Sequence, residues 1–130
     1  MNLSAGIAMM FKNYERFSCD KHLQKDWMDI FNSILKADSV NTKRLLEKQL
    51  DVDIKTNLKT TILMLICKTF PANKEDDVYS LAEYLLNRGV NVDEVDVFGK
   101  TAIYYAENSG FSKTTKLLLS CALIDQFNLT

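Results

Sequence analysis

The sequence is poor in the two residues that most readily bend a backbone, since its 130 residues include only four glycines and one proline. Folds rich in β-structure need many tight turns, and such turns depend on glycine for positive φ and on proline for a fixed φ. We therefore expect a fold with few tight turns, in which each glycine has a particular backbone role. The length suits one domain that buries a core without disulfides or metal ions.

Cysteine and long hydrophobic runs are also scarce. The three cysteines, Cys19, Cys67 and Cys121, are odd in number and widely separated, which favours reduced thiols over a disulfide framework. No uncharged stretch approaches the roughly 20 residues that cross a bilayer. The apolar residues 1–11 lack the basic residues and the cleavage site of a signal peptide. We expect a soluble protein of the reducing cytoplasm, with no membrane partner.

An excess of one charge is lacking too, because 16 basic and 17 acidic residues give a net charge of -1. Nucleic-acid binding needs a clustered basic excess, so we expect no nucleic-acid partner. Within residues 51–100, nine acidic side chains outnumber six basic ones. This local excess favours a protein partner with a basic surface.

Motifs for catalysis and for cofactor binding are missing. The single histidine, His22, lies near Cys19 in a lone C-x-x-H, without the second ligand pair that a zinc site needs. Glycine-rich phosphate loops and the serine-nucleophile motif are absent. We expect no catalytic residue, no metal site and no cofactor. The alternative from another class is a small metal-binding protein or cysteine enzyme built around Cys19 and His22.

Self-similar segments are present instead. Residues 44–53 (RLLEKQLDVD) align with residues 84–93 (YLLNRGVNVD), and residues 117–125 repeat the paired leucines. Upstream, residues 58–70 and 99–111 share the word Lys-Thr-x-Ile. Apolar residues recur at helical spacing in these segments, and glycines follow the helical stretches. The pattern predicts a repeating unit of two short helices, with an extended hairpin between units.

The clearest unit reads D-x-x-G-K-T-A-I-x-x-A over residues 96–106, followed by S-G-F and K-L-L-L, and it resembles the ankyrin repeat. The residues that match the family pattern in place are Asp96, Gly99, Thr101, Ala106, Gly110, Leu118 and Leu119, with Gly89 from the preceding unit. The resemblance implies an all-α, ankyrin-like solenoid of stacked helix-turn-helix units with short hairpin loops.

Departures from the family pattern occur in each unit. Tyr104 stands where the family favours histidine, and we expect its hydroxyl to bond the neighbouring turn. Three expected glycine positions hold other residues, namely Gln49, Leu58 and Thr69. Thr60 and Thr101 are 41 residues apart, against a family period of about 33. We assign the surplus to an enlarged loop over residues 70–77.

These matches divide the chain into an N-terminal helical cap or tail, residues 1–25, and an ankyrin-like repeat domain, residues 26–130. The expected units cover approximately residues 26–55, residues 56–96 with the insertion near 70–77, and residues 97–130. In the first segment Met10, Phe11, Tyr14 and Phe17 share one helical face, which suits a capping helix over the exposed end of the stack. A partner-binding helix and a mobile tail are the alternatives.

The resemblance also implies a non-catalytic module that binds another protein through its hairpin tips and the concave face of its first helices. The implied contact positions are Thr56, Asn57, Lys59 and Lys68 in the second unit, and Val95, Val97, Phe98, Lys100, Tyr105, Asn108 and Ser109 in the third. Phe98 is the sharpest candidate. It is either an aromatic anchor for the partner or it packs back onto Tyr105.

Narrower and different roles stay open at this point. The protein could be a dedicated inhibitor or immunity-type protein that neutralises one enzyme or toxin. Self-association through the ends of the stack is a structural alternative. Otherwise we expect a monomer or one component of a hetero-complex.

Overall fold

The structure is a computed structural model that describes residues 21–128, with side chains described for residues 25–122. Its helices are α2 (Lys21–Leu35), α3 (Ser39–Glu47), α4 (Ile62–Thr69), the short 3-10 helix η1 (Ala72–Lys74), α5 (Glu75–Asn87), α6 (Ala102–Asn108) and α7 (Ser112–Asn128). Within this part of the chain, β pairing is limited to an isolated antiparallel bridge between Lys55 and Thr61. The expected all-α architecture is confirmed.

None of the helices between residues 21 and 128 combines the length and the apolar character needed to span a bilayer.

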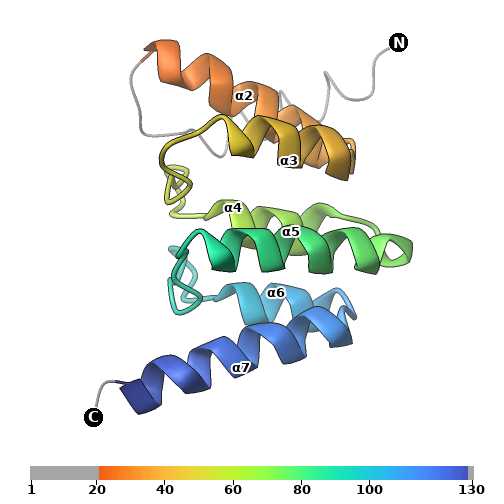
Figure 1. Ribbon diagram of the computed structural model, residues 1–130, viewed down its shortest axis with the longest axis vertical. Coiled ribbons are helices and arrows are strands. Elements are labelled where there is room, and N and C mark those ends of the chain that lie inside the picture. Colours follow the sequence, from red (N-terminus) through yellow and green to blue (C-terminus); the bar gives the residue numbers. More distant parts are fainter. Residues whose placement is uncertain (1–20, 129–130) are drawn as a thin grey trace.

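The helices form two layers that are stacked in sequence order (Figure 1). One layer holds α2, α4 and α6, and the other holds α3, α5 and α7. Neighbouring helices pack on each other within each layer, and the pairs α2–α3, α4–α5 and α6–α7 pack across the layers. The loops over residues 48–61 and 88–101, which lead into α4 and α6, lie on one side of this solenoid (Figure 1).

Helix α4 is the centre of the core. All of its residues from Ile62 to Cys67 are buried, because α2 and α6 cover it within its layer and α5 covers it from the other layer. A helix that is apolar on every side is stable only when neighbours cover every side. The core continues through Ile34 of α2, Leu85 of α5 and Phe111 before α7. No single unit therefore has a complete core of its own.

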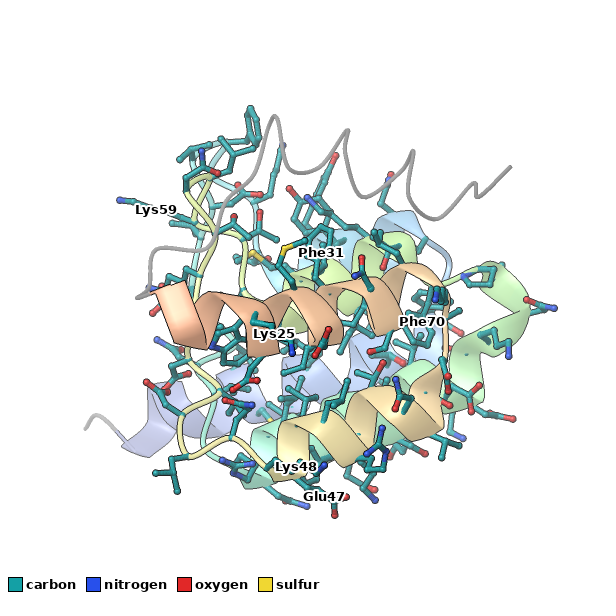
Figure 2. The ribbon with its side chains drawn as sticks, turned by 90° about the horizontal axis from the view of Figure 1, so that it is seen from above. Lys25, Phe31, Glu47, Lys48, Lys59 and Phe70 are labelled. Atoms are coloured by element: carbon teal, nitrogen blue, oxygen red, sulfur yellow. The ribbon has the colours of Figure 1, made fainter. Side chains whose placement is uncertain are left out.

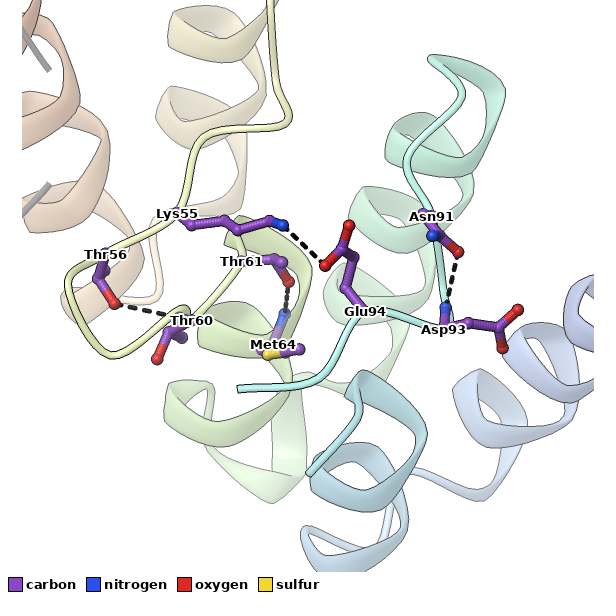
Figure 3. Close-up of polar contacts among 8 residues, drawn as sticks. All are labelled: Lys55, Thr56, Thr60, Thr61, Met64, Asn91, Asp93 and Glu94. Carbon is purple, nitrogen blue, oxygen red and sulfur yellow. Dashed lines mark hydrogen bonds and ion pairs between the residues drawn. The ribbon is translucent and has the colours of Figure 1, made fainter. Parts of the chain in front are cut away.

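Threonine hydroxyls begin both α4 and α6. The Thr61 hydroxyl accepts a hydrogen bond from the Met64 amide at 3.2 Å (Figure 3), and the Thr101 hydroxyl accepts one from the Tyr104 amide at 3.2 Å. Such N-caps satisfy an amide that the helix cannot bond internally. Because Thr61 and Thr101 occupy the same place in their units, the predicted alignment of Thr60 with Thr101 is wrong by one residue.

The shift by one residue also moves the position of the turn glycine. Lys59, not Leu58, is equivalent to Gly99, and the two residues have φ of 62° and 74°. This turn needs a left-handed backbone whatever side chain occupies it, so the lysine adopts a conformation that glycine adopts at lower cost. In the same way Ala37, with φ of 54°, takes the place between α2 and α3 that Gly110 takes between α6 and α7.

The two other positions where glycine was expected are not left-handed turns. Thr69 is the last residue of α4, and its hydroxyl donates to the Leu65 carbonyl at 2.6 Å. Gln49 follows the end of α3 without a positive φ. Helices α3 and α4 therefore end without the left-handed residue that follows α2, α5 and α6.

The predicted enlarged loop over residues 70–77 is wrong for most of its length. Pro71 leads into η1, and Glu75, Asp76 and Asp77 form the first turn of α5. Negative side chains are favourable there because the amides at a helix N-terminus carry partial positive charge. The surplus residues therefore form η1 and the first turn of α5.

The start of α5 also holds the start of α7. The Glu75 carboxylate accepts hydrogen bonds from the backbone amides of Lys113 at 2.8 Å and Thr114 at 3.4 Å. The Lys113 ammonium lies 4.6 Å from the centre of the Tyr79 ring, also on α5. The inserted residues therefore tie the third unit to the second.

Helix α2 begins at Lys21, before the predicted start of the repeat domain at residue 26. The boundary between the predicted cap or tail, residues 1–25, and the repeat domain therefore falls inside a helix. The predicted apolar face of Met10, Phe11, Tyr14 and Phe17 lies outside the described residues, and its capping role stays a prediction.

Arg88, at the end of α5, binds the end of the preceding unit. Its guanidinium donates to the carbonyls of Leu46 at 3.3 Å, Gln49 at 2.7 Å and Leu50 at 3.3 Å, and to the Tyr84 hydroxyl at 2.8 Å. Carbonyls at a helix C-terminus lack partners within the helix, and they favour a cation. One side chain thus satisfies several acceptors where α3 ends without a glycine.

Replacing Arg88 with alanine should lower the free energy of unfolding by roughly 1–3 kcal/mol, because hydrogen bonds from a charged donor to these carbonyls are lost. Arg88→Lys should recover only part of the loss, since an ammonium cannot reach several carbonyls in a fixed fork. Urea unfolding followed by circular dichroism measures both changes.

The control is Arg44→Ala, which removes an exposed arginine that bonds Asn41 within α3. We expect it to change the unfolding free energy by less than about 0.5 kcal/mol. Equal losses for Arg44→Ala and Arg88→Ala would contradict the inter-repeat role of Arg88.

Candidate protein-binding surface

The two long loops are bonded to each other. The Val97 amide donates to the Leu58 carbonyl at 3.0 Å. Nearer the helices, the Lys55 ammonium contacts the Glu94 carboxylate at 2.7 Å (Figure 3). These contacts fix the position of one loop relative to the other, so their tips form one continuous surface.

A buried carboxylate closes the turn of the 88–101 loop. Asp96 is 4% exposed, and its Oδ1 accepts hydrogen bonds from the amides of Phe98 and Lys100, both at 2.9 Å. The Asp96 amide in turn donates to the Lys100 carbonyl at 3.0 Å. The predicted matching aspartate therefore holds the turn from inside the molecule.

Thr56 holds the turn of the 48–61 loop in the same way. Its hydroxyl accepts hydrogen bonds from the amides of Leu58 at 3.3 Å and Thr60 at 3.1 Å, and the residue is only 3% exposed. The prediction of Thr56 as a partner contact is wrong for this reason. The shift in register explains the error, because Thr56 is the equivalent of the buried Asp96.

The second oxygen of Asp96 is bonded to Tyr105 of α6, whose hydroxyl donates to Oδ2. The expected bond from a tyrosine to the turn thus comes from Tyr105, and its assignment to Tyr104 is wrong. Burial of Asp96 disfavours its charged form. The hydrogen bonds from Tyr105 and from the two loop amides, together with the charge of Lys68, outweigh burial and hold the pKa of Asp96 below its ordinary value.

Aromatic rings and lysines continue outward from this buried bond. The Tyr105 and Tyr104 rings meet edge to face, with centroids 5.3 Å apart. The Lys100 ammonium lies 4.4 Å from the centre of the Tyr104 ring, and the Lys68 ammonium lies 5.4 Å from that of Tyr105. Both distances are within the range of cation–π attraction. The tyrosines therefore order the two lysines.

Exposed apolar side chains lie at the end of the loops beside these lysines. Phe98 is 66% exposed, Val97 50% and Tyr104 42%. We call Lys59, Val97, Phe98, Lys100 and Tyr104 the tip surface; Figure 2 shows Lys59 at the loop tips, directed away from the helices. The exposure of Phe98 favours its role as an anchor over its packing back onto Tyr105.

The other predicted contact residues differ in availability. Asn57, Val95 and Asn108 are exposed. Ser109 is half-buried, and its hydroxyl donates to the Cys67 carbonyl at 2.8 Å, so it joins α6 to α4. Tyr104 was predicted only as a replacement for histidine. Tyr104 lies three residues after Thr101, in the first turn of α6 beside the loop, and this position could have placed it on the surface.

An open groove borders the tip surface on the side of the first unit. Its polar lining includes the carboxylates of Asp26, Asp29, Asp51 and Asp53, and the lysines Lys48, Lys55 and Lys59. The groove lies at the junction of α2, α3 and the 48–61 loop. Lys59 is thus the member of the tip surface that also lines this groove.

Catalytic and metal chemistry finds no support in the described part of the chain. No group of three or more histidine, cysteine, aspartate or glutamate side chains there could hold a metal ion. Cys67 is completely buried, and burial raises the pKa of its thiol to about 12, so it is not a nucleophile at neutral pH. Cys19 and the side chain of His22 lie outside the described residues.

Comparison with known proteins gives one family. The family model for ankyrin repeats in three copies matches residues 34–128. Among solved structures, the crystal structure of the human ASB11 ankyrin repeat domain is similar to this chain, with a TM-score of 0.56 and 21% sequence identity. The match covers 70% of this chain and 38% of that one, and at this identity it shows the fold alone. No curated protein matches the sequence.

The lowered pKa of Asp96 predicts that the free energy of unfolding depends on pH. Because the folded-state pKa of Asp96 is lowered, its contribution to stability is present above its ordinary pKa of 3.8 and is lost as the pH falls through the folded-state value. Asp96→Asn should therefore lower the unfolding free energy by about 1 kcal/mol at neutral pH, and this difference should shrink below about pH 4. Urea unfolding at a series of pH values measures it.

Asp93→Asn removes an exposed carboxylate from the same loop and controls for the loss of charge as such. A difference between Asp96→Asn and the wild type that stays constant down to about pH 2 would contradict the role given to the ionised carboxylate.

Proposed function

The chain belongs to the ankyrin-repeat family, and from this premise we propose that it binds a partner protein through the tip surface and the adjoining face of α4 and α6. Ankyrin repeats are generally protein–protein interaction modules. The observation that carries the proposal is the exposure of Phe98 beside Val97 and Tyr104 on a loop whose backbone is held by buried hydrogen bonds.

The hydrogen bonds that fix the 88–101 loop favour a binding role for the exposed Phe98, Val97 and Tyr104. Binding costs free energy when a mobile loop must become ordered, and a loop already fixed by Asp96 and by its bond to Leu58 avoids much of that cost. Aromatic side chains that reach a partner from such a position are typical interface hot spots. Nothing in the core requires Phe98, so its size is better explained by an external contact.

The narrower roles predicted from the sequence stay within this proposal. A dedicated inhibitor or immunity-type protein would use the same surface on an enzyme or toxin. A reducing compartment is consistent with Cys67 and Cys121, both of which are free thiols. The partner with a basic surface also remains a prediction, although Asp96, one of the acidic residues behind it, is buried and Glu94 is paired with Lys55.

Phe98→Ala should weaken partner binding by roughly 2 kcal/mol or more, as expected for a central aromatic contact. The measurement begins with quantitative mass spectrometry of proteins that the wild type and the variant retain from an extract of the native cells. The affinity of each protein retained by the wild type alone is then determined by calorimetry. An enzyme that loses activity at one equivalent of the chain would establish the inhibitory role.

Val40→Ala is the matched control, because Val40 is an apolar residue with 79% exposure on α3, in the other layer. It should retain the same proteins as the wild type. Both variants should keep the circular dichroism spectrum and the melting temperature within a few degrees. Retention of the same proteins by all three chains would contradict the proposed surface, and unfolding of Phe98→Ala would show that Phe98 belongs to the core.

A further inference from the structure

We propose that the partner docks an acidic segment on the tip surface, with carboxylates beside an apolar side chain. This inference rests on the proposed function and adds the chemistry of the partner. Its basis is the positive charge of the tip surface, which is opposite to the net negative charge of residues 51–100. Residues 51–100 carry an acidic excess, yet the two charged members of the tip surface, Lys59 and Lys100, are both cations.

Asp96, the acidic residue closest in sequence to Lys100, is not available to a partner. Asp96 is 4% exposed, and both of its oxygens already accept hydrogen bonds from Phe98, Lys100 and Tyr105. A buried carboxylate whose oxygens already accept hydrogen bonds cannot form an ion pair with a side chain of a partner. Near the base of the loop Glu94 pairs with Lys55, and the exposed Asp51, Asp53 and Asp93 are not members of the tip surface.

The two lysines of the tip surface have no acidic partner within ion-pair distance among the described residues. Lys59 is exposed at the turn, and Lys100 is half-buried against the Tyr104 ring. Attraction to the ring holds the Lys100 ammonium in place without neutralising its charge. Less side-chain entropy is lost when a carboxylate then binds it.

The apolar side chains Val97 and Phe98 lie on the same loop as Lys100 and next to the loop that carries Lys59. Phe98 and Val97 follow the buried Asp96 and precede Lys100, while Lys59 comes from the neighbouring loop through the bond of Val97 to Leu58. A segment that combines acidic residues with a large apolar residue would match this set of side chains. Complementary charge of this kind raises the association rate and selects among partners that share the same apolar contact.

The acidic groove beside Lys59 limits where such a segment can lie. Its four carboxylates face only three lysines, one of which, Lys55, is already paired with Glu94, so the groove disfavours a further carboxylate. The opposite direction, along α6 and the third unit, offers Lys100 and the Tyr104 ring instead. We therefore place the segment over the 88–101 loop, with its end reaching Lys59.

The test is selection of displayed random peptides of about twelve residues on the immobilised wild-type chain, with counter-selection on Phe98→Ala. Peptides that depend on Phe98 are synthesised, and their affinity is measured by calorimetry at about 0.05 M and about 0.5 M NaCl. We expect them to carry an excess of aspartate and glutamate around an aliphatic or aromatic residue, and to bind roughly tenfold more weakly at the higher salt.

The charge requirement is tested by reversing both lysines. Lys59→Glu with Lys100→Glu should weaken binding of the selected peptides roughly tenfold or more, and the neutral pair Lys59→Gln with Lys100→Gln should give a smaller loss. The matched control is Lys43→Glu with Lys116→Glu. It makes the same change in net charge with exposed lysines of the other layer, one of which also lies over a tyrosine ring, and it should leave binding unchanged.

The outcomes separate this inference from the proposed function. Phe98-dependent peptides that are neutral or basic, or that bind the reversed chain as tightly as the wild type, overturn the acidic partner while the binding surface stands. Basic peptides would restore the partner predicted from the sequence. Recovery of no Phe98-dependent peptide contradicts both proposals. Self-association that Phe98→Ala abolishes would make a second copy of this chain the occupant and would also overturn the inference.

Discussion

Burial of α4 is the constraint from which the arrangement of this chain follows. Its apolar residues face every direction, so the helix needs α2 and α6 beside it and α5 across the layer. A unit that depends on both neighbours for its core forces the helices into a stack. The same stacking brings the 48–61 and 88–101 loops together on one side, where side chains from separate units form one surface.

The contacts between units are polar as well as apolar, and they are located where helices end. Arg88 satisfies carbonyls at the end of α3, and Glu75 satisfies amides at the start of α7. Helix ends carry unpaired backbone groups, so a side chain from the next unit can bond there without disturbing the apolar core. Such bonds are directional, so they fix how one unit is rotated relative to the next. Apolar packing alone is less directional.

The repeating unit could be predicted from the sequence because its signals are local. Helical spacing of apolar residues and the glycines at 89, 99 and 110 were sufficient for the third unit, and all three glycines have positive φ. The register of the second unit could not be obtained in the same way. Two threonines stand side by side there, and only the backbone shows that Thr61 caps α4 while Lys59 adopts the turn conformation.

The candidate surface was predicted in part for a related reason. Exposed residues at the turn, such as Phe98, follow directly from their place beside a glycine. Thr56 was misplaced because a threonine that anchors a loop through its hydroxyl looks, in a sequence, like a threonine in solvent. The acidic run from Glu75 to Asp77 was misplaced because negative charge suits a helix start as well as a loop.

The two loop anchors, Thr56 and Asp96, differ in the hydrogen-bond donors that they need. A threonine hydroxyl that accepts two amides, as in Thr56, is satisfied without a further donor, whereas a buried carboxylate has a second oxygen that needs one. The residue of α4 equivalent to Tyr105 is Leu65, which is buried. At position 96 that donor is the Tyr105 hydroxyl of α6. The Tyr105 ring contacts the Tyr104 ring, and the Tyr104 ring holds Lys100. The buried Asp96 is therefore linked, through Tyr105, to the side chains that the tip surface exposes.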